Sequence, residues 1–184
     1  MHRLLIRWHM LVAAFLFPAI LLYLVTGALY TWGAKGDYAT TDYAVTLSAP
    51  LTDDKAALQA IVVRELAERG IAPPTGGASV KPVGDSFQLD WTGSRRDVTL
   101  EPGESATTAK LIVKDTGWHR FFVQLHKAKG GTPFKVYAVV LALGLFFLVT
   151  SGLIVALKMP QMRRGAIIGS VVGLAAFAGV AAVS

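Results

Sequence analysis

The sequence predicts an α-helical membrane protein with three transmembrane helices and a small α+β domain outside the membrane. Hydrophobic residues make up 53% of its 184 residues and charged residues only 16%, whereas a soluble domain carries about 25% charged residues. Crossing a bilayer takes roughly 20 consecutive apolar residues. Three stretches reach or nearly reach this length without a charge, at residues 8–34, 136–157 and 165–184.

The basic residues predict how the chain is threaded. All twelve acidic residues lie between positions 37 and 115. Five basic residues flank the apolar stretches with no acid near them: Arg3, Arg7, Lys158, Arg163 and Arg164. Because such charges stay on the cytoplasmic side, we expect the N-terminus inside, and residues 35–133 and the C-terminus outside. The basic excess therefore faces the lipid bilayer and excludes nucleic acid as a partner.

Residues 1–34 are predicted to be an uncleaved anchor. A signal peptide has an apolar core of about 7–15 residues, whereas this stretch is longer and ends in the interfacial aromatics Tyr30 and Trp32. Pro18 is expected to kink the helix because it removes a backbone donor.

The exterior domain is predicted over residues 35–116, beginning with a polar linker at 35–49. A helix is expected over 52–69, with Thr52 as N-cap, Asp53 and Asp54 in its first turn and Gly70 after its end. Its apolar stripe consists of Leu58, Ile61, Val62 and Leu66. Its solvated face consists of Arg64, Glu65, Glu68 and Arg69.

After the Pro- and Gly-rich segment 72–77, the apolar residues alternate with a period of two. This pattern predicts strands near 79–83, 87–91, 97–100 and 109–114. The inward-facing residues would be Phe87, Leu89, Trp91, Val98, Leu100, Ala109, Leu111 and Val113. We therefore expect an antiparallel meander with one face covered by the helix.

Residues 117–133 are predicted to form an amphipathic segment on the outer membrane surface, followed by a transmembrane hairpin at 134–184. Its apolar side would carry Trp118, Phe121, Phe122 and Leu125, and its polar side Arg120, Gln124 and Lys127. The residues expected at the membrane interfaces are Arg3, Arg7, Trp8, Trp32, Trp118, Arg120 and Lys127.

Small residues mark candidate helix-packing faces in the apolar stretches. Gly165, Gly169 and Gly173 share one helical face, which would allow close approach of the chain's own spans or of a partner subunit. The first two spans also repeat a short pattern, Leu-Val-Thr-Gly at 24–27 and Leu-Val-Thr-Ser-Gly at 148–152. It suggests two helices packing through Thr26, Gly27, Ser151 and Gly152.

Several short motifs resemble the PepSY-associated transmembrane family. They are Arg-Trp-His at 7–9, Leu-Val-Thr-Gly at 24–27, Leu-His-Lys at 125–127 and Ser-Gly-Leu at 151–153. The resemblance implies a periplasmic PepSY-like domain on the bacterial inner membrane. It also implies larger four-span relatives that carry haem b and pass electrons outward, for instance to ferric siderophores. This chain departs from them in its three spans, short exterior domain and four histidines, so we do not expect an independent reductase.

His9, His119 and His126 are the candidate haem ligands. A bis-histidine haem needs one imidazole on each face of the iron. His9 is predicted inside and His126 outside, about 30 Å apart, and His119 shares a helical face with His126. Only a homodimer, in which a histidine of one copy faces the same histidine of the other copy, would place two imidazoles on one haem iron. In the other interpretation all three are interfacial residues and no cofactor is bound.

Two functions follow from these observations. The first is a non-enzymatic accessory or assembly subunit that docks on a larger membrane redox or transport complex. The alternative is a dimeric b-haem electron-transfer protein linked to iron reduction and uptake, which would make the chain part of a membrane reductase. A third interpretation makes the exterior domain a protease regulator. The absence of cysteine excludes thiolate metal sites, iron–sulfur clusters and a cysteine nucleophile.

Overall fold

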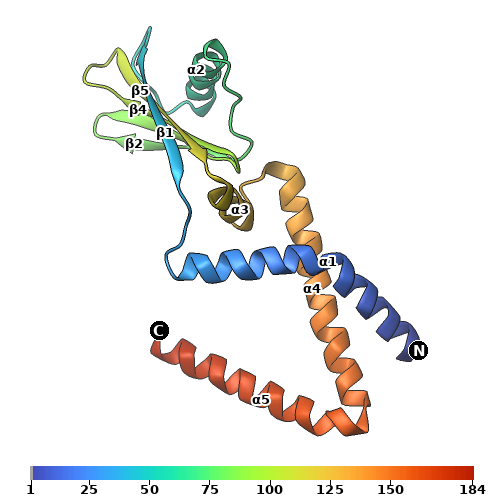
Figure 1. Cartoon of the computed structure of the whole chain (residues 1–184). Helices are drawn as coiled ribbons and strands as arrows, with labels where there is room; N and C mark the ends of the chain where they lie inside the picture. The colour runs from blue at the N-terminus through green and yellow to red at the C-terminus, as the bar shows by residue number, and fades with distance from the viewer. Residues whose placement is uncertain (1) are drawn as a thin grey trace. The chain divides into compact units, whose positions relative to one another are not determined.

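The computed structural model describes residues 2–184, which form five α-helices and one five-stranded sheet. These residues divide into two compact units. The first unit runs to Ile20 and continues from Val139 to Ser184, whereas the second comprises Leu21–Ala138. Figure 1 shows how these elements follow one another along the chain.

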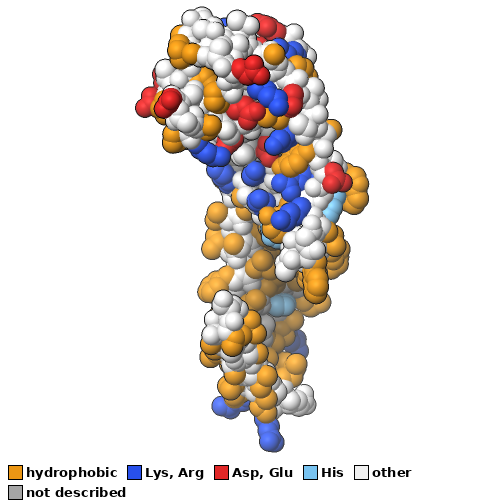
Figure 2. All heavy atoms as spheres, turned by 90° about the vertical axis from the view of Figure 1, so that its left-hand side faces the viewer, with side chains coloured by type: hydrophobic (Ala, Val, Ile, Leu, Met, Phe, Trp, Pro, Cys, Tyr) orange, Lys and Arg blue, Asp and Glu red, His pale blue; other side chains and the backbone are white. Residues whose placement is uncertain are grey.

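Three helices are long and apolar enough to cross a membrane, which confirms the three predicted spans. They are α1 (His2–Thr31), α4 (Gly131–Lys158) and α5 (Pro160–Val183). Their side chains are mostly exposed and apolar, as expected for surfaces that face lipid. In Figure 2 the acidic side chains gather over the sheet and α2, and the surface of the long helices is hydrophobic.

In the first unit, α1 and α4 pack against each other in antiparallel directions. Leu16 of α1 and Leu141 of α4 are each only 2% exposed. A Cβ at Gly144 would overlap the Leu16 side chain, so the glycine allows this close approach. None of the residues of α5 is buried.

The second unit contains a sheet in the order β1-β5-β4-β3-β2, in which every neighbouring pair is antiparallel. Its strands are β1 (Tyr38–Thr46), β2 (Ala78–Val83), β3 (Ser86–Trp91), β4 (Arg96–Pro102) and β5 (Thr108–Thr116). The predicted meander is confirmed as β2 to β5.

The prediction of a polar linker over 35–49 is wrong, because β1 occupies most of it. Tyr43 and Val45 face the core side of the sheet, but the other strand positions are polar or small and gave no clear alternation. Its backbone pairs along the whole length of β5, from Tyr38 opposite Thr116 to Thr46 opposite Thr108. The strand is therefore stabilised by a partner far away in the sequence, a contribution that local propensity does not include.

The helix α2 (Lys55–Glu68) covers one face of the sheet (Figure 1), as predicted. The core between them is formed chiefly by Leu58, Val62, Leu66, Leu89, Val98, Leu100, Leu111 and Val113, all at most 2% exposed. The predicted inward positions of the meander are thus confirmed, with Phe87 and Trp91 only partly buried.

Two details of α2 differ from the prediction. The N-cap is Asp54 rather than Thr52, and its Oδ1 accepts hydrogen bonds from the backbone N–H groups of Ala56 and Ala57. An ionised carboxylate is the stronger cap for the positive end of a helix. Glu65 is not on a solvated face but 7% exposed, and Arg69 Nη1 lies 3.0 Å from its carboxylate. That ion pair allows the charge to be buried.

Candidate functional site

His126, the last residue of α3 (Trp118–His126), is held against the end of α1 within the second unit. Its Nδ1 lies 2.9 Å from Thr26 Oγ1, and Thr26 is only 4% exposed. The ring also stacks on Tyr23, with centroids 4.7 Å apart and an interplanar angle of 29°. One hydrogen bond and one stacked ring thus fix both the position and the plane of this imidazole.

His9 makes a similar hydrogen bond to a hydroxyl within the first unit. Its Nδ1 lies 2.8 Å from Ser151 Oγ on α4, and Ser151 is 2% exposed. Each histidine therefore meets the hydroxyl of the repeated Thr-Gly or Ser-Gly step, a pairing that the repeat alone did not reveal. Hereafter the His126–Thr26 and His9–Ser151 contacts are called the two histidine–hydroxyl pairs.

The hydroxyl groups determine which nitrogen of each ring carries a proton. Thr26 Oγ1 lies 2.7 Å from the Leu22 carbonyl oxygen, and two oxygens this close need a proton between them. The Thr26 hydroxyl hence donates to Leu22 and accepts from the Nδ1–H of His126. Ser151 Oγ lies 3.2 Å from the Leu148 carbonyl oxygen, and donation to that oxygen would give the same assignment for His9. In the neutral form of both rings, Nε2 then carries the free lone pair.

A glycine beside each hydroxyl makes room for the ring. A Cβ at Gly27 would lie 3.2 Å from Cε1 of His126, and a Cβ at Gly152 would lie 3.4 Å from Cε1 of His9. The first distance is tighter than an ordinary contact and the second is at its lower limit. The four residues predicted as helix-packing positions thus lie against the two imidazoles.

His119 differs from the other two histidines. It lies on α3 beside Trp118, with ring centroids 5.7 Å apart. Its Nε2 is buried and has no hydrogen-bond partner among the described residues. His119 therefore has no hydroxyl that would fix its tautomer, and it is the weakest of the three candidate ligands.

A buried polar network joins α3 to the sheet within the second unit. Gln124, predicted on the polar side of the segment, is instead fully buried. Its Nε2 donates to Asp97 Oδ2 at 2.9 Å, to the Tyr38 hydroxyl at 3.2 Å and to the Gly93 carbonyl at 3.2 Å. Arg120 Nη2 donates to the same Tyr38 oxygen at 2.9 Å. The prediction that Gln124 faces solvent was wrong, because β1 and β4 supply polar partners that lie far from it in the sequence.

Asp97 is the centre of this network. Its Oδ2 accepts a 2.6 Å hydrogen bond from the Tyr38 hydroxyl, Lys129 Nζ lies 3.5 Å away, and the Gly93 N–H donates to Oδ1 at 3.0 Å. Burial, and then the hydrogen bond to Asp97, raise the pKa of Tyr38 above its usual value. The tyrosine thus stays a neutral donor to the carboxylate and anchors the helix that carries His126.

The predicted packing glycines of α5 touch no other part of the described chain. A Cβ at Gly165, Gly169 or Gly173 would meet no atom within 4 Å. Trp8, Trp32 and Trp118 are exposed, by 55%, 90% and 80%. Arg120 donates hydrogen bonds to the Tyr38 hydroxyl and to the Lys35 carbonyl oxygen. The Nζ atoms of Lys127 and Lys35 lie 5.6 Å and 5.4 Å from the centre of the Tyr30 ring. Arg3 and Arg7 are exposed at the start of α1.

Among the described residues, no group of three or more His, Asp or Glu side chains could hold a metal ion. An imidazole with its Nδ1–H bonded and its Nε2 lone pair free is, however, the form in which histidine serves as an axial ligand. Each histidine–hydroxyl pair therefore presents one imidazole of the kind that can bind a haem iron. The chemistry available at each is ligation by a neutral, oriented imidazole.

Three candidate membrane spans, a small α+β unit and two oriented imidazoles define a membrane protein with a compact sheet domain. The family model for PepSY-associated TM regions matches residues 2–180, and the chain belongs to this family. No curated protein and no solved structure matches the chain.

Proposed function

We propose that this protein is a b-haem electron-transfer component of the bacterial inner membrane, in which His9 and His126 would hold the haem iron and the haem would supply one-electron chemistry. The observation that carries the proposal is the contact between a helix hydroxyl and Nδ1 of each ring. With the Thr26 hydroxyl donating to Leu22 and the Ser151 hydroxyl donating to Leu148, each hydroxyl accepts from a histidine Nδ1–H. The lone pair of Nε2 is then free to bind iron.

Each pair offers a single imidazole, whereas a bis-histidine haem needs two. The second ligand would come from the mate of the same histidine in a second copy, or from a larger membrane complex. Bound haem b would carry one electron at a time between its ferric and ferrous forms. The residues of this chain would orient the ligand: the hydroxyls fix the tautomer, Gly27 and Gly152 make room, and Tyr23 fixes the ring plane of His126.

The proposed setting is the inner membrane, with residues 35–133 and the C-terminus on the periplasmic side. It is supported by the five cations that flank the spans without acidic neighbours. Electron flow would then run outward, toward an acceptor such as the ferric siderophores that the family resemblance implies.

The test is the visible absorbance spectrum of the full chain purified in mild detergent from haem-sufficient cells. We expect a Soret band that His126→Ala or His9→Ala reduces, while the control His119→Gln keeps it. Circular dichroism of each variant would check that its helical content is unchanged. A colourless wild-type protein, or a band of full height in both alanine variants, would rule out the proposal.

A second candidate function, an accessory subunit that docks on a larger complex, is favoured by α5. None of its residues is buried, and Gly165, Gly169 and Gly173 face open space on one side of the helix. We expect Gly169→Leu with Gly173→Leu to reduce co-purification with a membrane partner. Ala178→Leu, which adds a leucine side chain on the opposite face, should leave it unchanged. Equal recovery of the partner with both variants would remove this candidate.

A further inference from the structure

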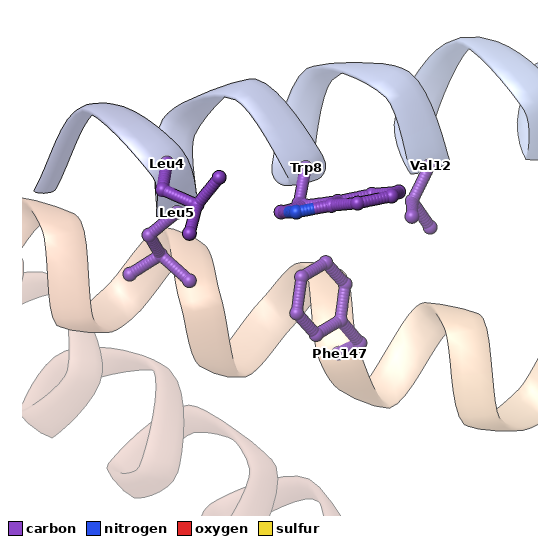
Figure 3. A pocket seen from close by; sticks show the side chains of 5 residues that line it. All are labelled: Leu4, Leu5, Trp8, Val12 and Phe147. Atoms are coloured by element: carbon purple, nitrogen blue, oxygen red, sulfur yellow. The ribbon is translucent and has the colours of Figure 1, made fainter. Parts of the chain in front are cut away.

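A groove between α1 and α4 in the first unit is lined only by apolar side chains. It has a volume of about 410 Å³ and is lined by Leu4, Leu5, Trp8, Val12 and Phe147. Figure 3 shows Phe147 reaching from α4 toward the flat face of Trp8, with the three aliphatic side chains along α1. Its volume lies in the range of roughly 300–1,000 Å³ that is typical of ligand pockets.

Two arginines of α1 lie in the helical row next to the residues that line the groove. Arg3 and Arg7 form one i, i+4 row, and Leu4 and Trp8 form the next row. Among the described residues neither guanidinium forms an ion pair. The long-helix unit contains no acidic residue that could provide one, because all the acidic residues lie between positions 37 and 115.

The packing of α1 on α4 adds further positive charge at the same end of this unit. His9 meets Ser151 and Leu16 meets Gly144, so α4 ends near the start of α1. Lys158 is the last residue of α4, and Arg163 and Arg164 follow in the first turns of α5. An occupant of the groove therefore meets an apolar wall, and the cations nearest to that wall along α1 are Arg3 and Arg7. Arg163 and Arg164 instead line a separate hollow on α5.

We infer that the groove binds an anionic phospholipid, with an acyl chain against Trp8 and Phe147 and the headgroup phosphate held by Arg3 and Arg7. An apolar groove in a span excludes water and is filled by hydrocarbon. Guanidinium groups bind phosphate oxygens in a two-pronged manner, and basic pockets beside transmembrane helices recognise anionic headgroups. The charge complementarity selects an anionic lipid over a zwitterionic one. The inference is independent of haem binding.

Trp8 reports on this site directly, because bromine atoms on an acyl chain quench a tryptophan that they touch. The full chain would be reconstituted in vesicles that contain brominated phosphatidylglycerol or brominated phosphatidylcholine at equal mole fraction. The signal of Trp8 is the difference between wild type and Trp8→Phe, and the signal of the control Trp32 is the difference between wild type and Trp32→Phe. We expect phosphatidylglycerol to quench Trp8 at least about twofold more than phosphatidylcholine, and both lipids to quench Trp32 equally.

Two double variants distinguish binding in the groove from attraction of anionic lipid by the overall positive charge of this surface. Arg3→Gln with Arg7→Gln should abolish the lipid preference of Trp8, whereas Arg163→Gln with Arg164→Gln removes the same charge and should preserve most of it. If both double variants lose the lipid preference of Trp8 quenching to the same extent, surface potential alone attracts the lipid and the proposed binding site is wrong. Equal quenching of Trp8 by both lipids would also overturn the site. Weak quenching by both would mean that another chain, such as a second copy, fills the groove.

Discussion

His126 and His9 each bond a hydroxyl that lies beside a glycine on a long helix, yet they are anchored to very different surroundings. His126 lies two residues after Gln124, whose amide is tied to Tyr38 and Asp97 of the sheet. His9 lies on a long helix with exposed neighbours and meets only α4. The position of His126 therefore depends on the folded domain, whereas the position of His9 depends on a single helix–helix contact.

The largest effect is expected for Gln124→Leu. The change removes three buried hydrogen bonds, leaves the Gly93 carbonyl without its side-chain donor and takes one of the donors away from Asp97 Oδ2. We expect a loss of about 2–3 kcal/mol in unfolding free energy, measured by circular dichroism in detergent. Gln88→Leu is the matched control, because the amide of Gln88 bonds only to Asp90, and it should cost no more than about 0.5 kcal/mol. If both changes cost the same, α3 is not anchored through Gln124.

Removing the hydroxyls tests the two histidine–hydroxyl pairs themselves. Thr26→Val keeps the shape of the side chain but removes the acceptor of His126 Nδ1–H, and Ser151→Ala does the same for His9. Each should cost about 1 kcal/mol. In ¹⁵N spectra of labelled histidine, the resonances of the affected ring alone should shift toward a mixture of tautomers. Unchanged ring resonances in Thr26→Val would show that the Thr26 hydroxyl does not set the proton position of His126.

Substitution of Gly27 or Gly152 by alanine tests how much free space lies beside the His126 and His9 rings. Alanine favours a helix over glycine by up to about 1 kcal/mol. At Gly152 the new Cβ would be 3.4 Å from the His9 ring, so we expect Gly152→Ala to be neutral or stabilising. At Gly27 the distance is 3.2 Å, and displacement of the stacked His126 ring should cancel that gain. Thermal unfolding should therefore rank Gly152→Ala above Gly27→Ala by about 0.5–1 kcal/mol, and the reverse order would contradict the packing.

The smallest effect is expected at the Lys81–Asp90 ion pair of the sheet, which provides a reference for the free-energy changes at the histidines. Burial alone would raise the pKa of Asp90, but hydrogen bonds and charge from Lys81, with help from Gln88 and Thr99, hold it below its usual 3.8. A lowered pKa stabilises the fold above pH 3.8, and this contribution disappears as the pH falls through the folded-state value. Asp90→Asn should therefore cost about 0.5 kcal/mol near pH 7. Stability curves against pH should converge in acid, and a constant gap would argue against the ion pair.

Local patterns predicted most of the elements of this protein. Uninterrupted apolar stretches gave the three spans, and alternation at positions such as Leu89, Val98 and Leu111 gave the meander, because burial on one side requires a period of two. The strand β1 was missed, since its residues pair with β5 from a distant part of the chain. Gln124 was misplaced for the same reason, because its partners lie on other elements.

The three spans and most of the sheet domain could be predicted from the amino-acid sequence, since hydrophobic length and periodicity are local properties of the chain. Short motifs predicted the family. The sequence also singled out the histidines and the repeated hydroxyl–glycine steps, but only as separate features. Tertiary structure alone decided that Thr26 meets His126 and that Ser151 meets His9. A hydrogen bond between residues so far apart in sequence depends on how the helices pack, and the direction of that bond sets which ring nitrogen is free.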